Sequence, residues 1–314
     1  MREKTIAIID LGSNSARMVV EKLKEDGTYQ EIFRVKEDTR LSQGMGDSLM
    51  LQEEPIQRTL RVLTDYRERL TKFSVEAIYG ITTAAVRTAK NQQDFLDRVY
   101  QAIGVRLRVL TGEEEAHYDF LGVLSSLPDE QSAVILDTGG ASVELIPYHQ
   151  KMAEAEVSLP FGAVNLSEKY HLADVISEKD IKNACQQIHA DYEKLPFIKD
   201  NQDQPVILLG GANRSLAKMA EKKGWAKQHQ TSLHGLFLSA DRVEQVFSEI
   251  SQMNRKEREH LAGLEKNRAD IIISGLLPVL NLIRVLHSPK VIFSESGVRE
   301  GLIFELIQKE FSHS

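Results

Sequence analysis

A strand–turn–strand segment that occurs twice constrains the fold of this chain more than any other feature. Residues 133–147, AVILDTGGASVELIP, start with four apolar residues, pass through Asp137 into a glycine-containing turn and return with alternating polarity. This pattern predicts a buried strand, a tight turn and a second, half-buried strand. Residues 6–20, IAIIDLGSNSARMVV, repeat the plan around Asp10, and every matched pair lies 127 positions apart. A match of this length indicates a duplicated unit.

Each turn has the chemistry of a phosphate site. Glycines let the backbone approach a ligand closely, and successive N–H groups can form a nest for a phosphate oxygen. The carboxylate directly before the turn suits a hydrated Mg²⁺ bound beside that phosphate. Either segment alone fits an ordinary glycine-rich hairpin equally well. Because there are two, we expect the turns to face each other across a cleft and to grip a polyphosphate from both sides.

The composition fits an ordinary globular protein of two domains. With 314 residues, of which 42% are hydrophobic, the chain can bury a substantial core. We place the boundary near residues 127–129. This gives an N-terminal domain of residues 1–127 and a C-terminal domain of residues 128–314, whose final helix can pack back on the first domain.

Charge, cysteine content and hydropathy limit the function classes. The net charge of −7 argues against a general nucleic-acid binder, because such proteins carry a net basic field. An anionic substrate must then be held by local Arg and Lys, backbone amides and metal. The single Cys185 suits a reducing compartment. No signal peptide and no apolar run of membrane-spanning length is visible, so we expect a cytoplasmic protein without a membrane partner.

Three other segments carry candidate residues. A polar loop at residues 39–44 contains Arg40, which fits either a solvated loop or a phosphate contact. Residues 80–87 run from a strand end into a helix, where Arg87 could bind phosphate or form a surface ion pair. Residues 205–215 read as a buried strand, a Gly-Gly turn and a helix with Arg214 in its first turn, which is a typical backbone-amide site.

Three consecutive glutamates follow Thr111. Thr111 is a predicted N-cap, and the helix dipole stabilises acids in a first turn. That explanation covers one or two of the glutamates, and one placed at the cleft could serve as a general base. Farther along the chain, we interpret His234 as structural, and Asp270 either as a helix cap or as a residue that reaches the metal cleft.

Apolar periodicity predicts alternating strands and helices along the whole chain. The predicted strands cover residues 5–10, 17–23, 29–36, 74–79, 105–110, 133–136, 143–146, 154–159, 205–209 and 291–294. The predicted helices cover residues 53–73, 91–103, 111–124, 175–195, 239–254 and 256–264, followed by a buried helix after Asp270 and a final helix.

The chain resembles the exopolyphosphatase and guanosine-pentaphosphate phosphatase family. The resemblance rests on motifs that occur in the family's order along nearly the whole chain. They are IDLGSNSARMVV at 9–20, TTAAVR at 82–87, TGEEEA at 111–116, LDTGGASVEL at 136–145, GGANRSLA at 210–217, RAD at 268–270 and SGVREG at 296–301. The second turn departs from the family's usual D-I-G-G-G-S, because Thr138 and Ala141 replace Ile and Gly.

This resemblance implies an α/β fold of the actin-like type, with two lobes, each a mixed sheet flanked by helices, and an active site between them. It implies Glu115 as general base, Glu144 close to the attacking water, and Mg²⁺, with Mn²⁺ as an alternative, near Asp137. The metal ligands expected from the residues and the resemblance together are Asp137, Asp10 and Glu144. The expected phosphate contacts are Gly12, Ser13, Asn14, Ser15, Arg40, Arg87, Gly139, Gly140, Ala141, Ser142, Gly210, Gly211 and Arg214.

We therefore expect hydrolysis of the terminal phosphoanhydride of inorganic polyphosphate by in-line attack of water. The alternative substrate is pppGpp, cleaved at its 5′-phosphate. A kinase of the same superfamily is a weaker fit because no acceptor site is visible, and a non-catalytic polyphosphate or nucleotide sensor is the alternative from another class. A homodimer is one assembly that the chain could form.

Overall fold

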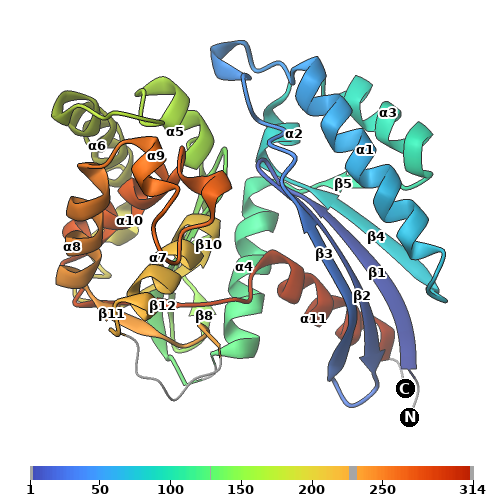
Figure 1. Cartoon of the computed structure of the whole chain (residues 1–314). Coiled ribbons are helices and arrows are strands. Elements are labelled where there is room, and N and C mark those ends of the chain that lie inside the picture. Colours follow the sequence, from blue (N-terminus) through green and yellow to red (C-terminus); the bar gives the residue numbers. More distant parts are fainter. Residues whose placement is uncertain (1–2, 128, 226–231, 312–314) are drawn as a thin grey trace.

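A computed structural model describes residues 3–127, 129–225 and 232–311 and shows two lobes side by side (Figure 1). Residue 128, at the predicted domain boundary, lies outside the described residues. The first lobe contains the strands β1 (Glu3–Leu11), β2 (Ala16–Lys24), β3 (Tyr29–Glu37), β4 (Ala77–Thr82) and β5 (Leu107–Val109). Its helices are α1 (Glu53–Leu70), α2 (Ala84–Thr88) and α3 (Gln92–Ile103).

The second lobe is built around a larger mixed sheet. Its strands are β6 (Ser132–Thr138), β7 (Val143–His149), β8 (Met152–Ala153), β9 (Val157–Leu159), β10 (Val206–Gly210), β11 (Phe237–Ser239) and β12 (Lys290–Phe293). Its helices are α5 (Ala163–Lys169), α6 (Glu178–Tyr192), α7 (Gly211–Lys222), α8 (Ala240–Ser251), α9 (Arg255–Arg258) and α10 (Ile272–Leu286). Two more helices, α4 (Gly112–Ser126) and α11 (Val298–Phe311), lie between the sheets.

The two sheets share one topology. In the first, the order is β3-β2-β1-β4-β5, and in the second it contains β7-β6-β10-β12. The hairpin β1-β2 corresponds to β6-β7, and the parallel neighbours β4 and β5 correspond to β10 and β12. The sequence repeat is thus a repeat of structure. Within it, Arg17 opposite Asp10 on the first hairpin corresponds to Glu144 opposite Asp137 on the second.

Helices cover both faces of each sheet. In the first lobe, one face packs on α1 and α3 and the other, through Ile6, Ile8 and Val19, on α11. In the second lobe, one face packs on α6, α7 and α10 and the other, through Ala133 and Ile135, on α4. Helices α4 and α11 pack against each other, so the final helix lies on the first sheet and also joins the two lobes (Figure 1). No helix among the described residues is both long and apolar enough to cross a membrane.

Several predicted elements differ from the structure. The strand predicted at 74–79 begins later, as β4, because its parallel register with β1 pairs Ala77 with Ile6 and Thr82 with Leu11. The helix predicted at 256–264 is only the short α9, which ends at Arg258; farther along, Gly263 has a φ of +95°, a conformation outside the helical region. Of the predicted strand at 154–159 only the last three residues form a strand, β9, and the short strands β8 and β11 were not predicted.

Candidate active site

The two repeated turns face each other between the lobes. Each is closed by an equivalent hydrogen bond: the Gly12 N–H donates to Ser15 O at 3.0 Å, and the Gly139 N–H donates to Ser142 O at 3.0 Å. A Cβ placed on Gly140 would lie only 2.9 Å from Cβ of Ser13 on the opposite turn. Glycine at this position therefore permits the close approach of the two turns.

These turns line a cleft with a cavity of about 140 Å³. The strand ends bring Asp10 and Asp137 to its floor, because each ends the central strand of its sheet. The predicted residues that line it are Asp10, Gly12, Ser13, Asn14, Ser15, Glu115, Asp137, Gly139, Gly140, Ser142, Gly210, Gly211 and Arg214. Arg40, Arg87, Ala141 and Glu144 are not in its lining, and the first two have assigned partners described below.

The three consecutive glutamates have three different environments. Glu113 is exposed to solvent, whereas Glu114 forms a capping box with Thr111 at the start of α4, which confirms the predicted N-cap. Glu115 is only 7% exposed and points into the cleft. Helix capping therefore explains Glu114 but not the burial of Glu115.

A polar chain connects the two candidate catalytic carboxylates. Arg87 Nη1 donates to Glu115 Oε2 at 2.8 Å and to the carbonyl of Leu110 at 3.0 Å, while its Nη2 donates to Ser158 Oγ at 3.3 Å. The Ser158 hydroxyl in turn donates to Glu144 Oε1 at 2.8 Å. Arg87 is thus a partly buried ion-pair partner of Glu115 rather than a surface ion pair.

An acidic cluster lies beneath the turns. One carboxylate oxygen from each of Asp119, Asp137 and Glu144 falls within 4.8 Å of the others. Asp119, one turn after Glu115 on α4, was not predicted, although the i, i+4 spacing places both on one helix face. Oδ1 of Asp137 and Oε2 of Glu144 are buried and make no hydrogen bond to the described residues. Buried oxygen ligands without partners fit a hard divalent cation such as Mg²⁺ or Mn²⁺.

The electrostatics of the site also fit a bound cation. Burial raises the pKa of Glu115 to about 7 and that of Asp137 to about 6, although Arg87 opposes the first shift and Arg17 and Arg214 the second. Burial and neighbouring carboxylates raise the pKa of Asp119 and Glu144 well above their ordinary values. Carboxylates crowded in this way ionise together only when a positive charge compensates them.

Guanidinium groups balance part of this negative charge. Arg17, Arg214 and Arg268 all line the cleft, and burial together with the charges of Arg17 and Arg268 lowers the pKa of Arg214 to about 10. The Arg268 guanidinium lies over Gly211, where an added Cβ would be 2.3 Å from Arg268 Cζ. Arg17 and Arg268 lie within motifs quoted above, but nothing in those motifs distinguishes them from the other arginines of the chain.

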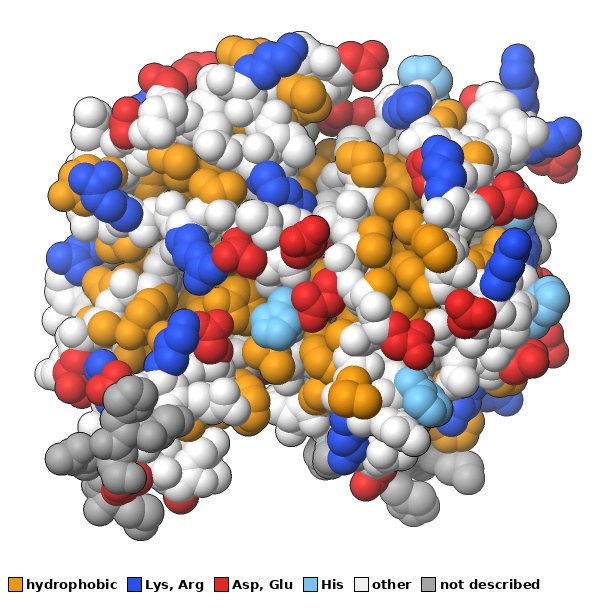
Figure 2. Space-filling model, turned by 180° about the vertical axis from the view of Figure 1, so that it is seen from behind, with side chains coloured by type: hydrophobic (Ala, Val, Ile, Leu, Met, Phe, Trp, Pro, Cys, Tyr) orange, Lys and Arg blue, Asp and Glu red, His pale blue; other side chains and the backbone are white. Residues whose placement is uncertain are grey.

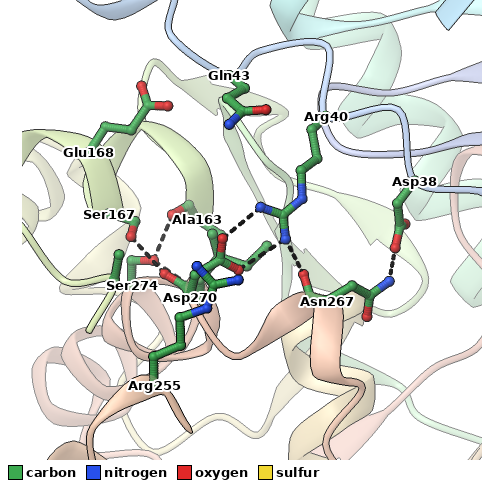
Figure 3. A network of polar contacts seen from close by, with 12 residues as sticks. Asp38, Arg40, Gln43, Ala163, Ser167, Glu168, Arg255, Asn267, Asp270 and Ser274 are labelled. Carbon is green, nitrogen blue, oxygen red and sulfur yellow. Dashed lines mark hydrogen bonds and ion pairs between the residues drawn. The ribbon is translucent and has the colours of Figure 1, made fainter. Parts of the chain in front are cut away.

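Arg40 and Asp270 form a contact between the lobes (Figure 3). Arg40 Nη1 donates to Asp270 Oδ2 at 2.6 Å, and its Nη2 donates to Asp270 Oδ1 at 3.1 Å and to the carbonyl of Asn267. Asp270 does not cap α10, whose N-cap is Ile271. His234 has both ring nitrogens engaged, with Ser126 O at 2.9 Å and the Glu295 N–H at 3.2 Å, in keeping with a structural role.

The sequence profile of the Ppx/GppA phosphatase family matches residues 19–310. The chain belongs to this family. The Ppx/GppA assignment agrees with the cleft between two lobes, and it confirms the resemblance read from the motifs.

Relatives of the chain carry two kinds of name. It is 26% identical over 320 residues to a "Putative exopolyphosphatase" of Haemophilus influenzae, covering 98% of this chain and 93% of that protein. It is 28% identical over 308 residues to a "Guanosine-5'-triphosphate,3'-diphosphate pyrophosphatase" of Pseudoalteromonas atlantica, covering 98% of this chain but 59% of that protein. The chain thus spans little more than half the length of some curated relatives.

Solved structures match the Ppx/GppA fold over the full chain. The Aquifex aeolicus member of the family superposes with a TM-score of 0.79 and 28% identity, covering 98% of this chain and 99% of that one. A nucleoside triphosphate hydrolase from Neospora caninum matches with a TM-score of 0.55 at 10% identity, which concerns the fold alone. The predicted α/β fold of actin-like type, with two mixed sheets flanked by helices, is confirmed.

Proposed function

We propose that this chain hydrolyses the terminal phosphoanhydride of inorganic polyphosphate and releases orthophosphate. The observation that carries the proposal is the buried Glu115, which faces the cleft between the two turns and is held by Arg87 at 2.8 Å. A carboxylate with a pKa raised to about 7 by burial is suited to take a proton from water near neutral pH.

The rest of the cleft provides binding and orientation. The turns at 12–15 and 139–142 present backbone amides from both lobes, and Arg17, Arg214 and Arg268 supply positive charge for phosphoryl oxygens. The face of the molecule seen from behind carries acidic and basic side chains interspersed (Figure 2). With a net charge of −7, the chain holds an anion through this local set and not through a broad basic field.

Asp119, Asp137 and Glu144 are proposed to hold Mg²⁺ or Mn²⁺, with Asp10 close by on the other strand end. A divalent ion bound there would neutralise charge that develops on the transferred phosphoryl group. The Ser158 hydroxyl donates to Glu144 Oε1 at 2.8 Å, so the chain of hydrogen bonds that orients Glu115 also positions the Glu144 carboxylate.

Guanosine pentaphosphate is the second candidate substrate, because relatives named for it match 96–98% of this chain. Its 5′-terminal phosphoanhydride presents the same chemistry to the cleft. A non-catalytic sensor remains the alternative from another class. A location in the cytoplasm, the metal's identity and a homodimer remain predictions.

The test is release of orthophosphate from purified protein offered polyphosphate, pppGpp and ATP side by side with Mg²⁺. We expect turnover of polyphosphate with ATP as a poor substrate, and its loss in Glu115→Gln. Binding of polyphosphate without any phosphate release would contradict the proposed enzymatic activity and favour a non-catalytic sensor. Release from ATP far faster than from polyphosphate would contradict the proposed substrate.

A further inference from the structure

The two lobes are joined by the ion pair of Arg40 and Asp270. Arg40 of the first lobe donates to both carboxylate oxygens of Asp270 in the second, from Nη1 at 2.6 Å and from Nη2 at 3.1 Å (Figure 3). The two side chains are only 24% and 12% exposed, so solvent screens the pair incompletely. A bidentate pair of this kind fixes direction as well as distance, because the guanidinium and the carboxylate are both planar.

On the first lobe, the backbone around Arg40 is hydrogen-bonded to the turn at 12–15. The Arg40 N–H donates to Asn14 O at 2.9 Å, and the Ser42 N–H donates to Ser13 O at 3.0 Å. Arg40 has a φ of +48°, a left-handed conformation that a residue with a side chain adopts only where its surroundings hold it there. The position of the guanidinium is therefore tied to the position of the turn.

On the second lobe, Asp270 is connected to the turn at 139–142 through α5. The Ser167 hydroxyl on this helix donates to Asp270 O at 2.8 Å. At the start of the same helix, the Ala163 N–H donates to Gly139 O at 2.9 Å. Figure 3 shows Ser167 next to Asp270 and Ala163 one helical turn before it. One short helix thus contacts both the turn and the residue that binds Arg40.

These hydrogen bonds form a continuous series from one turn to the other, and the Arg40–Asp270 pair is the step that crosses between the lobes. The series ends on carbonyl oxygens of both turns, so it competes with none of the N–H groups proposed to bind phosphate. Arg40 lies outside the cleft lining, and its guanidinium is occupied by Asp270 and the Asn267 carbonyl. Any effect of Arg40 on a bound phosphate is therefore indirect.

We infer that Arg40 and Asp270 form a positioning pair, which holds the two turns at the separation at which one phosphate chain contacts both. The inference rests on the proposed function, because it assumes that phosphoryl groups bind between the turns. It gives Asp270 a role other than that of a helix cap or a metal ligand. A misplacement of about 1 Å between groups that act on one substrate can cost about 10²-fold in rate, so loss of the pair should be visible in turnover.

The experiment is a double-mutant cycle on orthophosphate release from polyphosphate, with Arg40→Gln, Asp270→Asn and the double variant. We expect each single variant to lower kcat/KM by about 10- to 100-fold. The double variant should fall no further, because either change breaks the same pair. Arg69→Gln removes an equal charge from an ion pair with Asp65 within α1, and it should leave kcat/KM unchanged.

The Asp270→Asn variant distinguishes this role from direct binding of phosphate by Arg40. If Arg40 bound the substrate itself, loss of the Asp270 charge would free the guanidinium, and turnover would be unchanged or faster. That result would overturn the inference, as would losses in the single variants that add up in the double variant. The rise of Tm with Mg²⁺, which we assign to Asp119, Asp137 and Glu144, should persist in every variant. Its loss would show general damage to the fold and contradict a positioning role.

A distance measurement tests the pair even if no substrate is hydrolysed, in which case the proposed function fails. Spin labels attached after Arg61→Cys in α1 and Lys182→Cys in α6, in a Cys185→Ser background, report the separation of the lobes, because both sites are exposed. We expect Arg40→Gln and Asp270→Asn to shift or broaden the distance distribution equally. An unchanged distribution in both variants would overturn the inference, whatever the activity of the protein.

Discussion

Nη1 of Arg87 lies 2.8 Å from Oε2 of Glu115, so the arginine of one predicted motif and the glutamate of another form a single partly buried pair. The two residues reach each other from α2 and α4, at the edge where β4 and β5 end. This pairing means that a change at Arg87 alters the protonation of Glu115 as well as any contact with phosphate.

Arg87→Met should move the acidic limb of the pH–rate profile to higher pH. Burial raises the pKa of Glu115 to about 7 while Arg87 lowers it, so removal of the guanidinium leaves the pKa higher still. A general base acts in its deprotonated form, and the variant therefore needs a more alkaline solution. The measurement is kcat against pH. Arg61→Met, on the exposed face of α1, is the control, and an unchanged or more acidic limb in Arg87→Met would contradict the pairing argument.

Glu115→Gln should lower hydrolysis by about 10²–10⁴-fold, the usual contribution of a positioned base, while the fold is retained. Glu113→Gln is a matched control two residues away, because Glu113 is exposed and lies outside the cleft lining. Circular dichroism and orthophosphate release measured on both variants separate folding from chemistry. Near-normal turnover of Glu115→Gln would show that Glu115 is not the general base and would make Glu144 the candidate.

Asp137→Asn should abolish activity or demand much more Mg²⁺, because Asp137 supplies a buried oxygen without a hydrogen-bond partner to the acidic cluster. A ligand that binds only the folded protein raises its thermal stability. Added Mg²⁺ or Mn²⁺ should thus raise the Tm of the wild type and of Cys185→Ser, but not that of Asp137→Asn. Full activity of the wild type in excess chelator would exclude the metal role.

The sequence predicted the parts of the fold and site that are local. Hairpins, strand ends and the cap at Thr111 depend on neighbouring residues, and a repeat 127 positions apart identified the two facing turns. The sequence pattern alone was sufficient to predict each hairpin, because the strand, the glycine turn and the return strand follow one another without a long connection.

Contacts between distant segments could not be predicted in this way. Asp270, which binds Arg40, lies 230 positions after it in the sequence, and neither residue type indicates such a partner. Asp119 lies between the buried aromatic residues Tyr118 and Phe120 of α4, so its carboxylate has no local signature apart from its spacing to Glu115. A cavity of about 190 Å³ that Arg40, Gln43 and Glu168 help to line arises only where the loop 40–43 meets α5, which depends on how the two lobes pack.

Gly210→Ala should both destabilise the protein and weaken its response to metal. Gly210 has a φ of +95°, and a Cβ there would lie 2.5 Å from Thr138 O and 2.6 Å from Asp137 Oδ1. Gly224 offers a matched control, because its φ is +71° but an added Cβ would meet nothing within 4 Å. An alanine forced into this conformation costs about 1–2 kcal/mol, so Gly224→Ala should lose about that much free energy of unfolding. Gly210→Ala should lose more, since the methyl group also displaces Asp137, and its Tm should rise less with added Mg²⁺. Equal losses in the two variants, with equal responses to Mg²⁺, would show that Gly210 acts only through its backbone conformation and does not position Asp137.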